Sequence, residues 1–178
     1  VNAAGHIEAA AASRDGELFV TTDEARTFAK RISDAGFKGI WVSIANPCDV
    51  VSTEIQYLTG CDPTRVIGSG TTLDSARFRH ALSVATGYPA SCINAWMLGE
   101  HGNGQFALWS HVTFGCLTDK EVEAQTGLKF DRAQLEQDAR MGGYVTYKGK
   151  HCTEYSIANG AVEVIGAIVN DTKLVTPV

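Results

Sequence analysis

The stretch GIWVSIA at residues 39–45 is almost entirely apolar, and it decides the fold class. A short apolar run of this kind is typical of a parallel strand that is covered on both faces. Before this run, apolar side chains recur at the spacing of one helix face, at Ala25, Phe28, Ala29 and Ile32. Thr21 and Glu24 predict a capping box that starts this helix, and Gly36 predicts its C-terminal cap.

The residues after the apolar run continue an alternation of helices and strands. Asn46 and Pro47 end the predicted strand, and Asp49 predicts the N-cap of a helix that closes at Gly60. A second short strand is predicted at residues 65–67. Helix, strand, helix and strand in this order predict an open α/β sheet.

The pattern changes after Gly70. The remaining predicted helices cover residues 73–87, 130–141 and 153–169. The remaining predicted strands cover residues 92–98, 105–114 and 173–178. This order predicts an α+β arrangement rather than more βαβ units. We therefore expect a domain boundary near Gly70, between residues 1–70 and 71–178.

Composition and charge exclude several classes of partner. The formal net charge is −5 and no cluster of Lys and Arg is present, which argues against nucleic acid or an anionic membrane surface as a partner. No apolar run is long enough to cross a bilayer. The five cysteines are scattered without a CxxC pair, so a disulfide framework or a structural zinc site is not expected. A reducing, cytoplasmic location follows as the expectation.

The glycine-rich turn VIGSGTTL at residues 66–73 invites comparison with a dinucleotide fingerprint. That fingerprint needs a third glycine three residues after the second, where helix and strand pack closely. Leu73 occupies that position. The sequence therefore predicts a simple turn and no phosphate-binding loop.

Two further motifs carry groups suited to chemistry. Asp74 and Arg77 lie three residues apart on a predicted helix, and an arginine fork can bind a carboxylate with two donors. A surface ion pair is the common alternative. His101 stands between glycines at a strand end and could donate or accept a proton, although a lone loop histidine is more often structural. A metal site with Glu100 or His111 is disfavoured, because adjacent strand residues point to opposite faces.

In their order and spacing, four motifs resemble the lactate/malate dehydrogenase family. They are NPCD at 46–49, VIGSG at 66–70, LDSAR at 73–77 and GEHG at 99–102. The resemblance covers essentially the whole chain and favours the L-lactate or L-2-hydroxyisocaproate dehydrogenase type. It implies the second half of a Rossmann-like parallel sheet followed by an incomplete α+β catalytic domain. The chain is expected to be truncated at both ends, since the family's first βαβ unit has no counterpart in it.

The resemblance implies roles for individual residues. His101 would exchange the proton, Asp74 would orient and stabilise its imidazolium, and Arg77 would hold the substrate carboxylate. Arg14 matches the arginine that the family's mobile loop brings over the substrate. Asn46 would lie beside both the nicotinamide and the substrate oxygen.

Four other positions match the family's substrate and cofactor contacts. Gly5 ends the family's fourth strand on the cofactor side, and Ile157 lies behind the nicotinamide. Thr153 belongs to the substrate pocket. Glu8 occupies the position that discriminates substrates, commonly glutamine in lactate enzymes and arginine in malate enzymes, and we expect it to oppose a second substrate carboxylate.

The implied function is hydride transfer between NAD(H) and a small 2-oxo or 2-hydroxy acid with an uncharged side chain. No metal is implied, and a homodimer or homotetramer is expected. One alternative is a non-catalytic fragment that lacks the cofactor phosphate loop. A third hypothesis, an NAD-dependent glycosidase, is disfavoured because no matching metal-binding Cys and His cluster is found.

Overall fold

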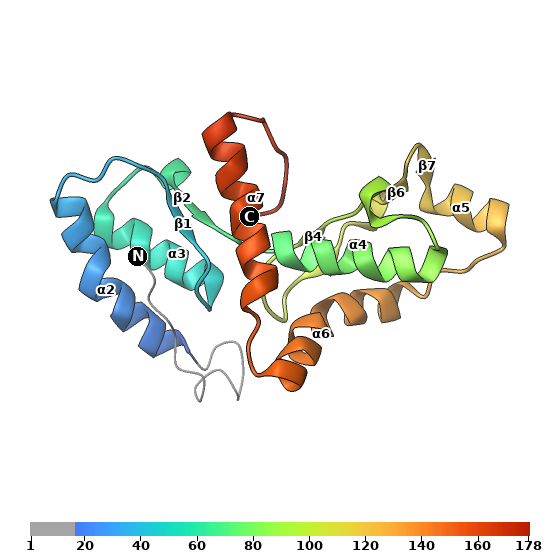
Figure 1. The fold of residues 1–178 in the computed structure, drawn as a ribbon, viewed down its shortest axis with the longest axis horizontal. Coiled ribbons are helices and arrows are strands. Elements are labelled where there is room, and N and C mark those ends of the chain that lie inside the picture. Colours follow the sequence, from blue (N-terminus) through green and yellow to red (C-terminus); the bar gives the residue numbers. More distant parts are fainter. Residues whose placement is uncertain (1–16) are drawn as a thin grey trace.

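The computed structural model describes residues 17–178, which form two lobes with a helix between them (Figure 1). The first lobe contains α2 (Leu18–Asp34), β1 (Trp41–Ser43), α3 (Cys48–Thr59), the 3₁₀ turn η1 (Pro63–Arg65) and β2 (Val66–Gly68). β1 and β2 are parallel, with Trp41 paired to Val66, and α2 packs on α3. The predicted alternation of helices and strands is therefore confirmed, with shorter strands.

Two caps in this lobe differ from the sequence predictions. The capping box at Thr21 is wrong: α2 begins at Leu18, because Thr21 N–H already donates to the Glu17 carbonyl at 2.8 Å. Asp49 is not the N-cap of α3 either, since Pro47 takes that place and Asp49 lies in the first helical turn. Gly60 ends α3 as predicted, with a φ of 61°.

The second lobe begins with α4 (Thr72–Thr86), which packs along α6 (Arg132–Lys150). Its short strands are β3 (Ile93–Asn94), β4 (Met97–Leu98), β5 (Phe106–Ala107), β6 (Thr113–Phe114) and β7 (Leu117–Thr118). β3, β6 and β7 form one antiparallel sheet, and β4 and β5 form another. The turn η2 (Ala90–Cys92) precedes β3, and the strand expected at 92–98 is divided into β3 and β4. The turn η3 (Trp109–His111) divides the strand expected at 105–114 into β5 and β6.

Several elements of this lobe correct the predictions. Residues 119–126 form α5 (Asp119–Thr126), which the apolar pattern does not predict because only Val122 is fully buried on it. α6 continues nine residues past the predicted end at Met141 and stops at His151, whose φ is 60°. Residues 173–178 form no strand; instead Thr72 Oγ1 donates to the Pro177 carbonyl at 2.7 Å.

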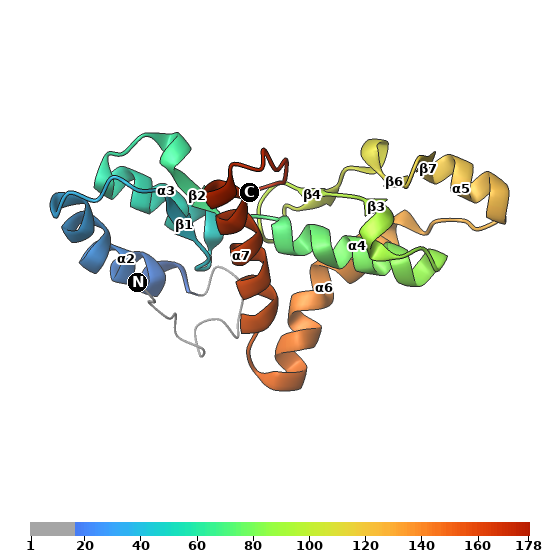
Figure 2. The same cartoon turned by 45° about the horizontal axis from the view of Figure 1, so that its top comes forward.

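The last helix, α7 (Glu154–Asn170), stands between the two lobes and packs on α4, as both views show (Figure 2). Gly70, with a φ of 47°, lies in the short link between β2 and α4. A domain boundary at this link stays a prediction. In the part of the chain that the structure describes, no helix is long and apolar enough to cross a membrane.

Candidate active site

The first turn of α4 places a carboxylate in the interior of the second lobe. Asp74 is fully buried, and a helix N-terminus stabilises negative charge. This end of α4 is fastened to β4, because Thr71 Oγ1 donates to the Met97 carbonyl at 2.6 Å and Met97 N–H donates to Ser75 Oγ at 2.9 Å. The carboxylate position is therefore set by packing and by hydrogen bonds to a neighbouring strand.

His101 reaches this carboxylate from the loop that follows β4. Its side chain is 8% exposed, and its Nδ1 is hydrogen-bonded to Asp74 Oδ2 across 27 residues of sequence. Arg77 Nη1 donates to the other oxygen, Oδ1, at 3.0 Å. The structure thus brings His101, Asp74 and Arg77 together. The surface reading of the Asp74–Arg77 pair is wrong, because the Arg77 side chain is only 15% exposed.

This arrangement has a clear chemical capacity. A buried carboxylate needs charged or hydrogen-bonding partners. Here the Arg77 guanidinium and the His101 imidazole both bond to the Asp74 carboxylate. A carboxylate on Nδ1 fixes the orientation of the ring. Nε2 is then the ring atom at which a proton could pass to or from a substrate. Their chemical roles remain predictions.

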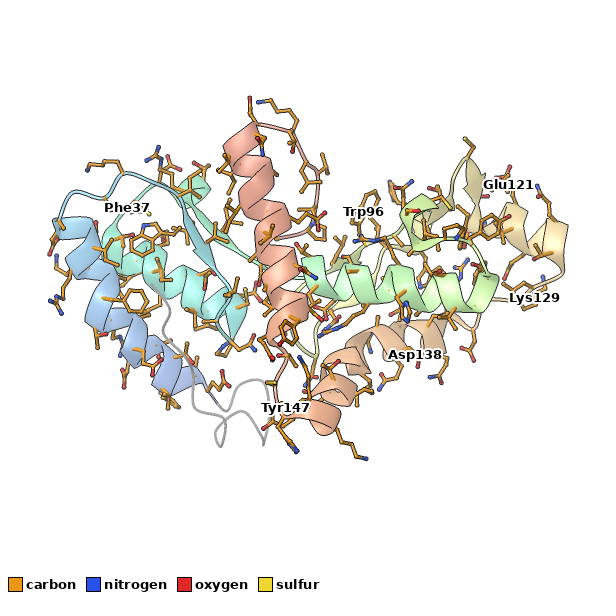
Figure 3. The ribbon with its side chains drawn as sticks, viewed as in Figure 1. Phe37, Trp96, Glu121, Lys129, Asp138 and Tyr147 are labelled. Atoms are coloured by element: carbon orange, nitrogen blue, oxygen red, sulfur yellow. The ribbon has the colours of Figure 1, made fainter. Side chains whose placement is uncertain are left out.

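Arg77 also borders open space. An elongated groove of about 840 Å³ runs between α4, α6 and α7, and Arg77 lines it, whereas His101 does not. Asp138 lies on the α6 side of this groove, where it is labelled in Figure 3. Gly142 leaves room for the arginine, since a Cβ at that position would come within 2.9 Å of Arg77 Cδ. Of His101, Asp74 and Arg77, Arg77 is the one that lines this groove.

Two residues that support the His101 loop were missed by the sequence analysis. Gln105 is buried, and its Nε2 donates to the Gly102 carbonyl at 2.8 Å. His101 N–H donates to Asp49 Oδ2 at 3.2 Å. Gln105 could have been noticed in the sequence, because it is a polar residue that begins the largely apolar segment 105–114. Nothing in the local pattern around Asp49 predicts its contact.

The other predicted site residues are located by the elements that carry them. Asn46 is half-buried between β1 and α3, while Thr153 is the N-cap of α7 and Ile157 lies in its first turns. Their part in a site stays a prediction. Gly5, Glu8 and Arg14 lie outside the described residues.

A cysteine and a glutamate flank Thr153. The pKa of the Cys152 thiol is raised, mainly by its hydrogen bond to the Glu154 carboxylate, and the pKa of Glu154 is lowered by the same bond first. The thiol therefore stays protonated at neutral pH. At neutral pH the start of α7 therefore presents the Thr153 hydroxyl and a neutral Cys152 thiol.

Asn46 and Ile157, which were predicted to contact a nicotinamide ring, are both partly exposed, and that contact stays a prediction. The turn before α4 does not suit phosphates, because Ser69 N–H donates to the Ser43 carbonyl at 2.8 Å and Gly70 N–H to Cys48 Sγ at 3.4 Å. Over residues 17–178, no three His, Cys, Asp or Glu side chains are grouped to hold a metal.

Comparison with known proteins places these observations in context. Residues 71–178 match the family model for the lactate/malate dehydrogenase α/β C-terminal domain. L-lactate dehydrogenase of Lacticaseibacillus casei is 38% identical over 148 residues, which cover 82% of this chain and 45% of the relative. L-lactate dehydrogenase of Streptococcus pneumoniae (strain ATCC BAA-255 / R6) is 34% identical over 85% of this chain and 47% of the relative. The chain thus spans about half the length of these curated relatives.

Solved structures of lactate and malate dehydrogenases are similar to this chain as well. A lactate dehydrogenase from a Medee basin deep-sea metagenome library is similar with a TM-score of 0.87 at 30% identity, over 99% of this chain and 55% of that one. Malate dehydrogenase of Cryptosporidium parvum has a TM-score of 0.87 at 26% identity, over 93% of this chain and 54% of that one. The similarity therefore extends beyond the matched residues 71–178 into the first lobe.

Proposed function

The chain belongs to the lactate/malate dehydrogenase family, and on that premise we propose that it carries the substrate-binding and proton-transfer half of an NAD-dependent L-2-hydroxyacid dehydrogenase. The observation that supports this most is the buried Asp74 carboxylate joined to both His101 and Arg77. In this proposal residues 1–70 are the C-terminal half of a Rossmann domain, and residues 71–178 belong to the catalytic domain.

Each residue then has one task. Arg77 binds the substrate carboxylate with its planar fork, which holds the 2-oxo carbon in place. His101 donates a proton from Nε2 to the carbonyl oxygen, and Asp74 stabilises the imidazolium that supplies it. NAD supplies the hydride chemistry when bound, and Asn46 and Ile157 would contact its nicotinamide end.

The substrate side of the proposal adds three residues. Thr153 would contact the substrate from the start of α7, and Arg14 would polarise its carbonyl while excluding water. Glu8 would repel a second carboxylate, so pyruvate or a longer uncharged 2-oxo acid is favoured over oxaloacetate. We also propose a homodimer or homotetramer for the intact enzyme.

The test is NADH oxidation by 2-oxo acids, with the protein expressed from its complete reading frame. His101→Asn should lower turnover by about 10²–10⁴-fold, because proton transfer is lost, while NADH binding stays near the wild-type value. Turnover of the variant within about tenfold of wild type would overturn the assignment, since that is only about 1.4 kcal/mol of barrier.

A second candidate is a chain that does not catalyse by itself. Two observations favour it. The Ser69 and Gly70 amides bond within the protein, to the Ser43 carbonyl and to Cys48 Sγ, and the chain covers only part of its relatives. Titration of the 178-residue chain with NADH separates the two. Saturable binding favours the enzyme, and its absence favours a fragment that needs the rest of the cofactor domain.

A further inference from the structure

We propose that Asp49 is a positioning residue, which fixes the position of the His101 backbone relative to the turn that carries Asn46. The proposal rests on the proposed function, because it concerns how the proton donor is aligned with the turn beside the nicotinamide. Its primary observation is the hydrogen bond from His101 N–H to Asp49 Oδ2 at 3.2 Å, which spans 52 residues of sequence.

The two ends of His101 are held by carboxylates from different lobes. Asp74, on α4 of the second lobe, bonds the imidazole Nδ1. Asp49, on α3 of the first lobe, accepts the backbone N–H. A side-chain partner alone lets the ring swing with its loop, whereas a second partner on the backbone restricts the loop itself.

Two residues hold the backbone of the loop around His101: Gln105, which donates to the Gly102 carbonyl, and Asp49, which accepts the His101 N–H. Gly99 has a φ of 91°, and a Cβ there would come within 2.8 Å of the Gly104 carbonyl, so glycine is required. Gly102 follows His101 directly. Glycine-rich backbone has wide conformational freedom, so chain stiffness does not set the position of the His101 amide.

Asp49 is itself firmly tied to the turn that carries Asn46. Pro47 and Cys48 between them are both buried, and the Pro47 carbonyl accepts Val51 N–H at 3.0 Å. The first turn of α3 also favours a carboxylate electrostatically. Two buried residues therefore connect Asn46 to the exposed Asp49, and one hydrogen bond joins Asp49 to His101.

This geometry matters because hydride and proton transfer require atoms from both lobes to meet. A misplacement of about 1 Å can lower a rate by about 10²-fold. Loss of the Asp49 acceptor should therefore act on turnover more than on substrate binding, since Arg77 grips the carboxylate through α4 and does not depend on this bond.

The first test uses the 178-residue chain and needs no catalysis. In Asp49→Ala, the amide hydrogen of His101 should exchange with solvent at least about tenfold faster than in wild type, measured by NMR. Asp49→Asn keeps an acceptor oxygen and should stay within about threefold. Glu54→Gln is the matched control, because it removes one charge from the same helix at a carboxylate that bonds Arg26 instead.

The second test uses the protein from its complete reading frame. Asp49→Ala should lower kcat about tenfold or more with KM for pyruvate changed less than about threefold, and Asp49→Asn should restore most of kcat. Asp49→Ser, which suits a helix start but is too short to reach His101, should behave like Asp49→Ala. The Asp49→Ser variant replaces Asp49→Ala in both tests if the alanine variant does not fold.

The outcomes are distinct. Unchanged His101 exchange in Asp49→Ala and Asp49→Ser overturns the positioning role. Faster exchange with unchanged kcat also overturns it, provided that His101→Asn abolishes turnover in the same assay. If His101→Asn leaves turnover intact, the proposed function fails, while the exchange measurement still decides whether Asp49 holds the loop.

Discussion

The two lobes bury very different interiors. The second lobe encloses a large cluster that contains Phe78, Leu82, Met97, Val112, Phe114 and Val122. The first lobe encloses a small one, made of Ala25, Ala29, Val51 and Ile55. Several large apolar side chains of the first lobe remain exposed, among them Phe19, Phe37, Ile40 and Ile44. Phe37 of this lobe and Glu121 of the other lie at opposite ends of the molecule (Figure 3).

This difference explains where a buried charge can be held. The Asp74 carboxylate is shielded in the lobe whose aromatic rings interlock, with Phe78 edge-on to Trp109 at 5.2 Å between centroids. The first lobe has a cavity of about 330 Å³ beside its small core, and the larger groove of about 840 Å³ lies along α4, α6 and α7. We expect the two lobes to respond unequally to substitution.

The largest effect is expected in the second lobe. Phe78→Ala should lower the free energy of unfolding by about 3–5 kcal/mol, because it removes a fully buried ring from a closed core. Urea denaturation followed by tryptophan fluorescence measures this. Val84→Ala on the same helix is the control, since an exposed substitution should change stability by less than about 0.5 kcal/mol.

A smaller effect is expected in the first lobe. Ile55→Ala should cost about 2 kcal/mol, the low end for such a change, because Ile55 lines a cavity that is already open. Amide exchange should speed up in α2 and α3 and stay unchanged in α4. If Ile55→Ala destabilises as much as Phe78→Ala, or if α4 exchanges faster, the lobes do not differ as proposed.

A third prediction concerns the exposed end of the second lobe. Thr118→Ala should destabilise α5 by about 1 kcal/mol, because Thr118 caps the helix in a reciprocal capping box with Glu121. Thr118→Ser keeps the hydroxyl and should lose little. Exchange of the α5 amides provides the measurement, and equal exchange in the alanine and serine variants would contradict the role of the cap.

The same cap should depend on pH. The pKa of Glu121 is lowered, chiefly by the backbone N–H of Thr118 and then by its hydroxyl. A carboxyl with a lowered folded-state pKa stabilises the fold at pH above its ordinary value, and this contribution is lost as pH falls through the folded pKa. The difference between wild type and Glu121→Gln in α5 exchange should therefore shrink on acidification below the ordinary pKa of glutamate.

The smallest effect lies at the start of α7, between the lobes. Because the pKa of Cys152 is raised first by its hydrogen bond to Glu154, little thiolate is present near pH 8. Glu154→Gln should speed the alkylation of Cys152 by iodoacetamide a few-fold, with the more exposed Cys116 as the internal reference. Mass spectrometry of the labelled peptides measures both rates, and an unchanged ratio would refute the effect.

Local pattern predicted much of this molecule. The apolar run at 39–45 and the helical spacing around it identified α2, β1 and α3, and glycine at Gly60 marked a helix end correctly. The family motifs singled out Asp74, Arg77 and His101. The structure brings these three side chains into contact, and their roles stay predictions. Prediction failed at α5 and at the end of α6, where apolar spacing is weak or glycines interrupt it.

The sequence by itself determined the elements and the kinds of functional side chain, because helix spacing, caps and the chemistry of His, Asp and Arg depend on neighbours a few residues away. Only the tertiary structure decided how far those side chains are buried and which distant partners they meet. Asp74 is fully buried where the start of α4 meets β4 and the loop that carries His101. The contact between Asp49 and His101 joins the two lobes across 52 residues of sequence, a relation that no local pattern encodes.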